Sequence, residues 1–363
     1  MKLIQTSEYV APGHPDKVAD TISSLILDAH LRQDPNVRYA LEVQLKGEHC
    51  TIAGELTTRA VIMEDEIAEL AREAVAKIGY TAEYQRRFGA DNTICADDLK
   101  VACHITRQSP DIAQGVDADG WGDQGIFWGM ATNERKFGYM PRDYHYARLL
   151  GLNLYALARK GTLPIGLDIK TQVETQDGEP TAAIIAAPML YDAPAKAVRT
   201  LAASLLPGID PERVIVNGTG RYATHGPIAD CGTTGRKLAV DFYGGNCRIG
   251  GGSPWTKDPS KADLALNIYA RFVALRYILA NPQWGKVYVG ISCCIGRRDI
   301  RVTIYDQTGG QLDTRIESRP ARELIADLAL RKPMYAELCM NGLFTDVDAA
   351  VAGIEPLGLG LAE

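Results

Sequence analysis

The sequence predicts an α+β fold of three similar units, because one pattern recurs three times along its 363 residues. In each unit, a segment with helical spacing of apolar residues precedes two short alternating strands, and a second helical segment follows. A typical domain has about 100–200 residues, so a chain of this length needs more than one core. We therefore expect domains at about 1–112, 113–224 and 225–363, with exchange of segments between them left open.

The first unit starts at Pro15, a residue that suits the first turn of a helix. Apolar side chains recur after it at helical spacing, and Gly79 ends the second helical stretch. Between the two helices, Gly47 lies in a turn that joins two alternating segments. The expected elements are helices at 16–34 and 62–78 and strands at 38–45 and 51–58.

The second and third units repeat this order with their own local signals. Asp143 is a good N-cap for the next helix, and Gly161 ends that helix. The pair Asp177-Gly178 is a strong hairpin signal between two strands. The expected elements are helices at 144–160, 194–205, 260–280 and 321–330, and strands at 168–176, 181–187, 213–216, 286–294 and 299–305.

Two long segments, 108–125 and 217–258, do not fit either periodic pattern. The first is rich in Asp and Gly, and the second contains ten glycines. Long irregular stretches inside a compact protein are usually functional loops or disordered segments. Glycine lets backbone amides approach an anion closely, so both segments are candidates for binding loops.

Composition argues against several classes of protein. The formal net charge is −6, so no dominant basic field would attract a nucleic acid. No apolar run approaches the roughly 20 residues of a membrane span. The eight cysteines form no C-x-x-C pattern, and we expect them to be reduced core thiols in a cytoplasmic protein.

Four polar residues of the first unit are candidates for a site. In the motif 13–17, His14 could donate to a phosphate oxygen and Asp16 could hold Mg²⁺ beside the amides of a helix start. The alternative is a simple helix cap with a surface histidine. Glu42 and Glu55 lie in neighbouring predicted strands, where they would line a site as paired carboxylates or form a solvated sheet face.

Two motifs of the second unit carry charges at a turn and at a strand start. Asp123 lies between glycines in 122–125, where an ordinary turn is the alternative to a site. Asp168 and Lys170 are two residues apart at the start of a predicted strand, so both side chains point to one face. A solvated face would explain this pair equally simply.

The segment 226–263 is the most informative. Four cations and three glycine clusters suggest a cradle for a polyphosphate, with a mobile basic loop as the alternative. The spacing does not fit a Walker A loop, and no G-x-G-x-x-G follows a strand, so a dinucleotide fold is not supported. Among the positively charged residues of the segment, the four meant here are Arg236, Lys237, Lys257 and Lys261.

At these residues the chain resembles the S-adenosylmethionine synthase family over nearly its whole length. The resemblance implies three similar α+β domains about a pseudo-threefold axis, and dimers or dimers of dimers with active sites between subunits. The matching strings are 13–20 (GHPDKVAD), 54–58 (GELTT), 108–112 (QSPDI), 122–125 (GDQG), 131–134 (ATNE), 161–164 (GTLP), 168–170 (DIK), 217–221 (NGTGR), 235–237 (GRK), 243–245 (YGG), 250–252 (GGG) and 257–261 (KDPSK).

The resemblance also implies roles for individual residues, with ATP and L-methionine as substrates and K⁺ and two Mg²⁺ per site as cofactors. The ATP-binding residues would be His14, Asp168, Lys170, Arg221, Tyr222, Asp230, Arg236, Lys237, Ser253, Lys257 and Asp263. The methionine-binding residues would be Glu55, Gln108, Asp123, Asp230, Lys261 and Ile295. The metal ligands would be Glu8, Asp16, Glu42 and Asp263. The largest effects on chemistry would come from His14, Lys170, Arg236 and Lys257.

The family transfers the adenosyl group of ATP to methionine and then cleaves the released tripolyphosphate to pyrophosphate and phosphate. The methionine sulfur has no proton to lose, so the first step needs alignment and charge stabilisation but no general base. We weigh three alternatives: an inactive or regulatory ATP-binding homologue, a stand-alone tripolyphosphatase, and a pure binding or scaffold protein, which would leave the many cations unexplained. Every carried-over charged position is filled, which favours activity, and a retained methionine pocket argues against the hydrolase.

Several positions depart from the family pattern. The loop 108–125 looks several residues shorter than usual, which would alter how the site is closed. Ile249 stands where a histidine is usual, and residues 253–256 replace a usual Ala-Phe-Ser-Gly. Tyr222 keeps an aromatic ring where phenylalanine is common. These changes indicate a divergent member of the family.

Overall fold

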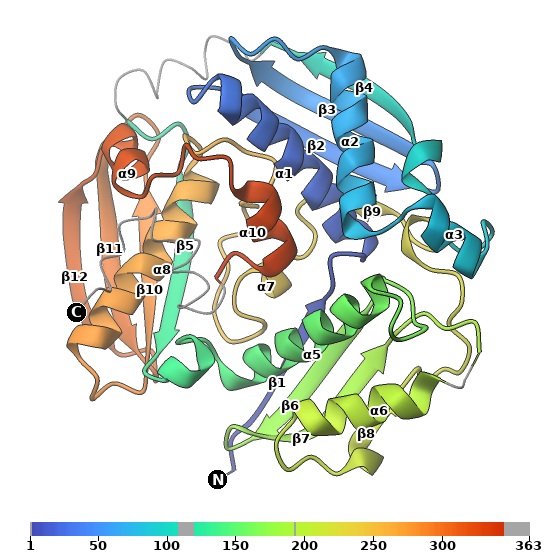
Figure 1. The fold of residues 1–363 in the computed structure, drawn as a ribbon. Helices are drawn as coiled ribbons and strands as arrows, with labels where there is room; N and C mark the ends of the chain where they lie inside the picture. The colour runs from blue at the N-terminus through green and yellow to red at the C-terminus, as the bar shows by residue number, and fades with distance from the viewer. Residues whose placement is uncertain (1, 108–119, 192–193, 345–363) are drawn as a thin grey trace.

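The computed structural model describes residues 2–107, 120–191 and 194–344 and contains three four-stranded sheets (Figure 1). The first sheet has the order β4 (Lys100–Thr106), β3 (His49–Thr57), β2 (Arg38–Lys46), β9 (Gly232–Thr233). The second has the order β1 (Ile4–Val10), β6 (Lys170–Gln176), β7 (Glu179–Ala186), β8 (Val214–Val216). The third has the order β12 (Gln311–Ser318), β11 (Asp299–Asp306), β10 (Lys286–Cys293), β5 (Gly125–Thr132). The predicted α+β class is confirmed.

A pair of helices accompanies each sheet, and Figure 1 shows the three units around a common centre. The first sheet has α1 (Pro15–Gln33) and α2 (Glu64–Ile78), the second α5 (Arg142–Arg159) and α6 (Pro194–Leu205), and the third α8 (Ala262–Ala280) and α9 (Ala321–Asp327). The shorter helices are α3 (Ala82–Phe88), α7 (Leu238–Asp241) and α10 (Tyr335–Asn341). Single 3₁₀ turns lie at Ala96–Asp98, Arg135–Phe137, Pro211–Arg213 and Gly226–Ile228.

Three strands lie in a different sheet from that of their sequence neighbours. β1 pairs with β6 in the second sheet, β5 pairs with β10 in the third, and β9 pairs with β2 in the first. The ranges 1–112, 113–224 and 225–363 thus contain the helices and hairpins of each unit, but these three strands cross between units. As domain limits, the ranges stay a prediction.

Each sheet buries one face and exposes the other. In β2, Tyr39, Leu41, Val43 and Leu45 are buried, whereas Glu42 points to the opposite face, as the alternation predicts. Apolar side chains are also exposed on the outer faces of the other two sheets. These residues are Ile126 (56%), Ile184 (44%), Ile215 (49%) and Ile316 (68%).

The helices and strands that were expected lie within two residues of the observed bounds, with one exception. The predicted helix 321–330 ends at Asp327, and Ala329 has a positive φ of 49°. The expected N-cap Asp143 is wrong, because α5 begins one residue earlier, at Arg142. The Asp143 carboxylate instead accepts hydrogen bonds from Ser7 Oγ (2.7 Å) and Asn246 Nδ2, so it joins β1 to the glycine-rich segment.

Two expectations of the sequence concern the whole chain. Within the described ranges, no helix combines the length and apolar character that would span a bilayer. All eight cysteines are free thiols, but only Cys50, Cys95 and Cys339 are buried as expected of core residues. Cys294 is exposed and the other four are half-buried, so the expectation of core thiols is wrong for them.

Asp28 attaches α10 to α1 near the end of the described chain. Its two carboxylate oxygens accept hydrogen bonds from the backbone N–H groups of Tyr335 and Ala336, each at 2.9 Å. Burial raises the pKa of Asp28, although these two donors oppose the shift. The carboxylate therefore satisfies amides at the start of α10 that have no partner within the helix.

We expect the substitution Asp28→Ala to lower the free energy of unfolding by about 1–3 kcal/mol, because two buried N–H groups lose their acceptor. Urea denaturation measures this change. Glu69→Ala on the exposed side of α2 is the control, with an expected change within about 0.5 kcal/mol. An equally small change for both variants would contradict the role of Asp28.

Candidate active site

The turn between β1 and α1 places His14 at the N-cap of the helix. Its Nδ1 atom accepts a hydrogen bond from Asp16 N–H at 3.2 Å, so in the neutral ring the proton lies on Nε2. Burial and the nearby charge of Lys237 lower the pKa of His14 to about 3. His14 is therefore a neutral N–H donor beside the start of a helix.

Asp16 links this turn to the segment that follows β9. One carboxylate oxygen accepts a hydrogen bond from Thr233 N–H at 2.8 Å, and the other is bound by the Lys237 ammonium group. Burial would raise the pKa of Asp16, but the Lys237 and Thr233 hydrogen bonds outweigh it and lower the pKa. Asp16 is therefore ionised and already paired with a cation.

Lys170 and Glu8 lie diagonally across the β1–β6 pair, because Glu8 is in register with Gln172 and Lys170 with Val10. Their Nζ and Oε2 atoms are 3.2 Å apart, and each side chain is 44% exposed. Lys170, Lys237 and Asp230 all lie close enough to His14 to influence its pKa. An anion at His14 would therefore meet two lysines, one of which is half exposed.

Asp168 is buried just before β6. Its Oδ2 atom accepts a hydrogen bond from Gly226 N–H at 2.9 Å, and the Tyr222 hydroxyl donates to the Asp168 backbone carbonyl at 3.2 Å. Burial raises the pKa of Asp168 to about 6. The neighbouring Arg221 and the acidic Asp230 are both exposed.

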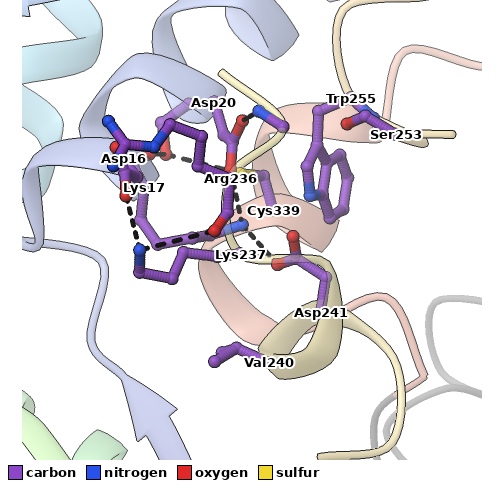
Figure 2. A network of polar contacts seen from close by, with 12 residues as sticks. Asp16, Lys17, Asp20, Arg236, Lys237, Val240, Asp241, Ser253, Trp255 and Cys339 are labelled. Carbon is purple, nitrogen blue, oxygen red and sulfur yellow. Dashed lines mark hydrogen bonds and ion pairs between the residues drawn. The ribbon is translucent and has the colours of Figure 1, made fainter. Parts of the chain in front are cut away.

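We call these residues the His14 group: Glu8, His14, Asp16, Asp168, Lys170, Arg221, Tyr222, Asp230, Arg236 and Lys237. Arg236 belongs to it as the exposed neighbour of Lys237. Figure 2 shows how α1 and the segment after β9 bring Asp16, Arg236 and Lys237 together.

The two ends of the glycine-rich segment are attached to β2. At one end, β9 pairs with Gln44 and Leu45 of β2. At the other end, Leu41 N–H donates to the Thr256 carbonyl at 3.2 Å, and Lys257 lies opposite Ala40. Both ends of the segment are therefore fixed to one strand.

Lys257 forms the centre of a second set of predicted site residues. Its ammonium group pairs with Asp263, near the start of α8. Next to it, the Glu42 carboxylate accepts hydrogen bonds from the hydroxyls of Thr234 and Thr256. Glu55 is exposed on β3 in register with Ala40, the same residue that lies opposite Lys257.

The edge of the third sheet adds two more predicted residues. Ile295 is 54% exposed and bridges to Trp121, while the Asp123 carbonyl accepts from the Cys293 thiol at 3.3 Å. Burial, aided by Asp123, raises the pKa of Cys293 to about 12. Asp123, Cys293 and Ile295 therefore share one corner of the sheet.

We call the second set the Lys257 group: Glu42, Glu55, Asp123, Ser253, Lys257, Lys261, Asp263 and Ile295. Among the described residues, no hydrogen bond or ion pair joins a member of this group to a member of the His14 group. The last predicted site residue, Gln108, and most of the expected gating loop lie outside the described residues.

The predicted metal ligands are dispersed in this state. In the part of the chain that the structure describes, no three His, Cys, Asp or Glu side chains gather as a complete metal site. Glu8, Asp16 and Asp263 each pair with a lysine, and Glu42 accepts from two hydroxyls. Their roles as ligands stay a prediction.

The sequence reasoning missed a buried set of charges beneath the His14 group. Lys17 pairs with Asp20 at 3.2 Å and with Asp241 at 2.6 Å, and all three side chains are almost fully buried (Figure 2). The three-residue spacing of Lys17 and Asp20 on a predicted helix was the available signal, because such residues are neighbours on a helix surface. No motif or spacing in the sequence singled out Asp241.

The glycine run 250–252 depends on small residues for its packing. A Cβ atom at Gly250 would collide with the backbone carbonyl of Ile126, and one at Gly252 would collide with the Asp263 carboxylate. Gly245, in the same segment, has room, because the nearest atom to its added Cβ is 3.8 Å away. The run thus packs tightly against β5 and the start of α8.

We expect Gly250→Ala to lower the free energy of unfolding by about 1–3 kcal/mol, because the backbone of β5 cannot yield without repacking. Thermal or urea unfolding tests this, with Gly245→Ala as the matched variant. The idea fails if Gly250→Ala is tolerated as well as Gly245→Ala.

Comparisons with known proteins agree with the fold and identify the family. The family description "S-adenosylmethionine synthetase, N-terminal domain" matches residues 2–110, and the C-terminal domain description of the same family matches residues 224–351. S-adenosylmethionine synthases of Akkermansia muciniphila and Desulforudis audaxviator are each 36% identical to the chain, over 94% of it and 93% of their own length.

A solved structure extends the agreement to three dimensions. The unusual S-adenosylmethionine synthetase from Campylobacter jejuni superposes with a TM-score of 0.83 at 29% identity. The match covers 98% of this chain and 99% of that one. The chain therefore belongs to the S-adenosylmethionine synthase family, the methionine adenosyltransferases.

Proposed function

We propose that this chain transfers the adenosyl group of ATP to L-methionine at the residues of the two groups and then hydrolyses the tripolyphosphate. The observation that carries this proposal is the setting of His14. A neutral N–H donor, a helix start and two lysines converge where the phosphates of ATP would bind. Family membership supplies the overall reaction, and this geometry supports the placement of the phosphates.

In the first step, the methionine sulfur attacks C5′ of ATP and the C5′–O bond breaks. The leaving tripolyphosphate gains charge, which His14, Lys170, Arg236, Lys237 and Lys257 would stabilise. His14 suits this step because it donates a hydrogen bond from Nε2 without first having to lose or gain a proton. The chain needs no general base, because a sulfonium forms from a thioether without proton loss.

In the second step, water attacks a phosphorus atom of the bound tripolyphosphate, and pyrophosphate and phosphate form. The same cations hold the charged oxygens during this cleavage.

The remaining roles divide between nucleotide and amino acid. We assign Asp168, Arg221, Tyr222, Asp230, Ser253 and Asp263 to ATP. We assign Glu55, Gln108, Asp123, Asp230, Lys261 and Ile295 to methionine. The half-exposed Ile295 supports an apolar contact for the methionine side chain, and the exposed Glu55 and Asp123 support contacts to its ammonium group.

The donor sets fit the two cations of the family. Mg²⁺ is commonly held by one or two carboxylates together with substrate phosphates, so Asp16, Asp263 and Glu8 can serve without forming a closed cage. Glu42 with the hydroxyls of Thr234 and Thr256 offers oxygen donors of the kind that suits K⁺. Mg²⁺, where bound, supplies positive charge to the phosphoryl oxygens.

We further propose that two copies of the chain complete each site, in a dimer or a dimer of dimers. The separation of the predicted residues into two groups supports this arrangement. The exposed isoleucines on the outer sheet faces support it as well, because apolar sheet faces of this kind are commonly covered in oligomers. The composition favours a cytoplasmic enzyme with small-molecule substrates.

We expect the purified protein to form S-adenosylmethionine from ATP, methionine, Mg²⁺ and K⁺, and Lys170→Ala or His14→Ala to slow this about 100-fold or more. Mass spectrometry measures the product, with a reaction that lacks methionine as the control. Near-normal rates in either variant would remove that residue from the mechanism. Tripolyphosphate cleavage without methionine-dependent product would indicate a hydrolase instead.

We expect a mixed dimer of Lys170→Ala and Lys257→Ala subunits to regain activity, because one of its two sites would keep both lysines. Random assortment makes half of the dimers mixed, so total activity should reach about a quarter of the wild-type value. The two chains are coexpressed with the same tag, so that mixed and unmixed dimers are purified together. The matched control combines Lys170→Ala with His14→Ala, which lie in one group and should stay inactive. If the first pair also stays inactive, shared sites are ruled out.

A further inference from the structure

Lys17 is a buried cation at the centre of contacts with three separate parts of the chain. Its side chain is 5% exposed, and its Nζ atom lies 2.6 Å from Asp241 Oδ1 and 3.2 Å from Asp20 Oδ2. The same atom lies 4.7 Å from the centre of the Trp255 ring, a cation–π contact. Figure 2 shows Asp20, Asp241 and Trp255 around Lys17, with Arg236 and Lys237 beside them.

Asp20 contacts both Lys17 and the turn 235–237, which carries the proposed phosphate-binding residues Arg236 and Lys237. Its Oδ1 atom accepts a hydrogen bond from Gly235 N–H at 2.9 Å, while Oδ2 faces Lys17. Gly235 has a φ of 72°, which glycine adopts without strain. The Asp20 carboxylate thus holds the residue directly before Arg236.

Asp241 holds the other side of the same turn. It lies at the end of α7, and its backbone N–H donates to the Lys237 carbonyl at 2.8 Å. Its carboxylate is tied to Lys17. Lys17 therefore holds both sides of the turn 235–237, through Asp20 on one side and Asp241 on the other.

The cation–π contact with Trp255 links Lys17 to the far end of the glycine-rich segment. It is 1% exposed and lies two residues before Lys257, the centre of the second group. Lys17 itself follows Asp16 directly in the chain. One side chain therefore connects the His14 turn, the turn 235–237 and the approach to Lys257.

A buried ion network of this kind is poor evidence for stability, because removing the charges from water costs about as much as their attraction returns. Its geometric consequence is more specific, since the charge-assisted hydrogen bonds have fixed directions. Lys17 contacts no exposed surface through which a substrate could reach it. Its effect on the reaction must act through the residues it holds.

We propose that Lys17 is a positioning residue, which acts through Asp20 and Asp241 to hold Arg236 and Lys237 in place for the polyphosphate. This inference rests on the proposed function, because it needs those two cations to bind the phosphates. It adds one condition to that function: the turn 235–237, which carries both cations, must be held against α1. Loss of the network should weaken phosphate binding in particular.

Asp20→Ala tests this inference, because it removes the acceptor of Gly235 N–H without touching a proposed substrate ligand. We expect the KM for ATP and the KM for added tripolyphosphate to rise about tenfold, with the KM for methionine changed less than twofold. Asp28→Ala is the matched control. It removes another buried carboxylate of α1 that binds backbone N–H groups, but those groups belong to α10.

A purely structural role would lower the stability and the active fraction of both variants and leave every KM unchanged. That result for Asp20→Ala would overturn the inference. Asp20→Asn retains an oxygen for Gly235 N–H, and we expect its KM for ATP to fall between wild type and Asp20→Ala. Equal KM values for the Asn and Ala variants would contradict the hydrogen bond as the means of positioning.

Lys17→Met provides an independent measurement if Asp20→Ala does not fold. Methionine keeps most of the volume against Trp255 but cannot bind either carboxylate. We expect the same selective rise in the KM for ATP and for tripolyphosphate, and unchanged values would overturn the inference. The wild-type protein is assayed in parallel: if it makes no S-adenosylmethionine, the proposed function fails, whereas an active wild type with unaffected variants rejects only the role of Lys17.

Discussion

The attachment of the glycine-rich segment to β2 is the constraint on which the candidate site depends. β9 pairs with one end of β2, and residues 256–258 return to the other end. At that return, Asp258 accepts from Tyr39 N–H at 2.8 Å and also from Ser260 N–H, so one buried carboxylate secures both the strand and the approach to α8. Because both ends are fixed, the cations between them have defined neighbours although few of them lie in regular structure.

The sequence predicts well the elements whose signals are local. The helical stripe of α1, the alternation of β2 and the turn at Asp177-Gly178 each depend on a few neighbouring residues, and the structure confirms them. β1, β4, β5, β9 and β12 were not predicted. β1 pairs with a strand more than 150 residues away, and β9 has two residues, so neither has a periodic pattern of its own.

The candidate site shows the same division. His14, Asp168 and Lys170 could be selected from motifs, since each lies at a helix or strand start. The neutral state of His14 could not be predicted, because it depends on burial and on Lys237, which lies more than 200 residues along the chain. The role of Lys17 could not be predicted for a related reason. Its partner Asp241 lies more than 200 residues along the chain, and only the fold brings the two side chains together.

The exchange of strands gives the molecule a property that its separate units would lack. The second sheet needs β1 from the start of the chain, the third needs β5, and the first needs β9 from beyond the second. A fragment cut at any boundary between units would therefore lose an edge strand from at least one sheet and expose the strand next to it. Such a chain gains little from folding one unit at a time, because contacts that close each sheet are distant in sequence. We therefore expect slow folding in which the three units form together.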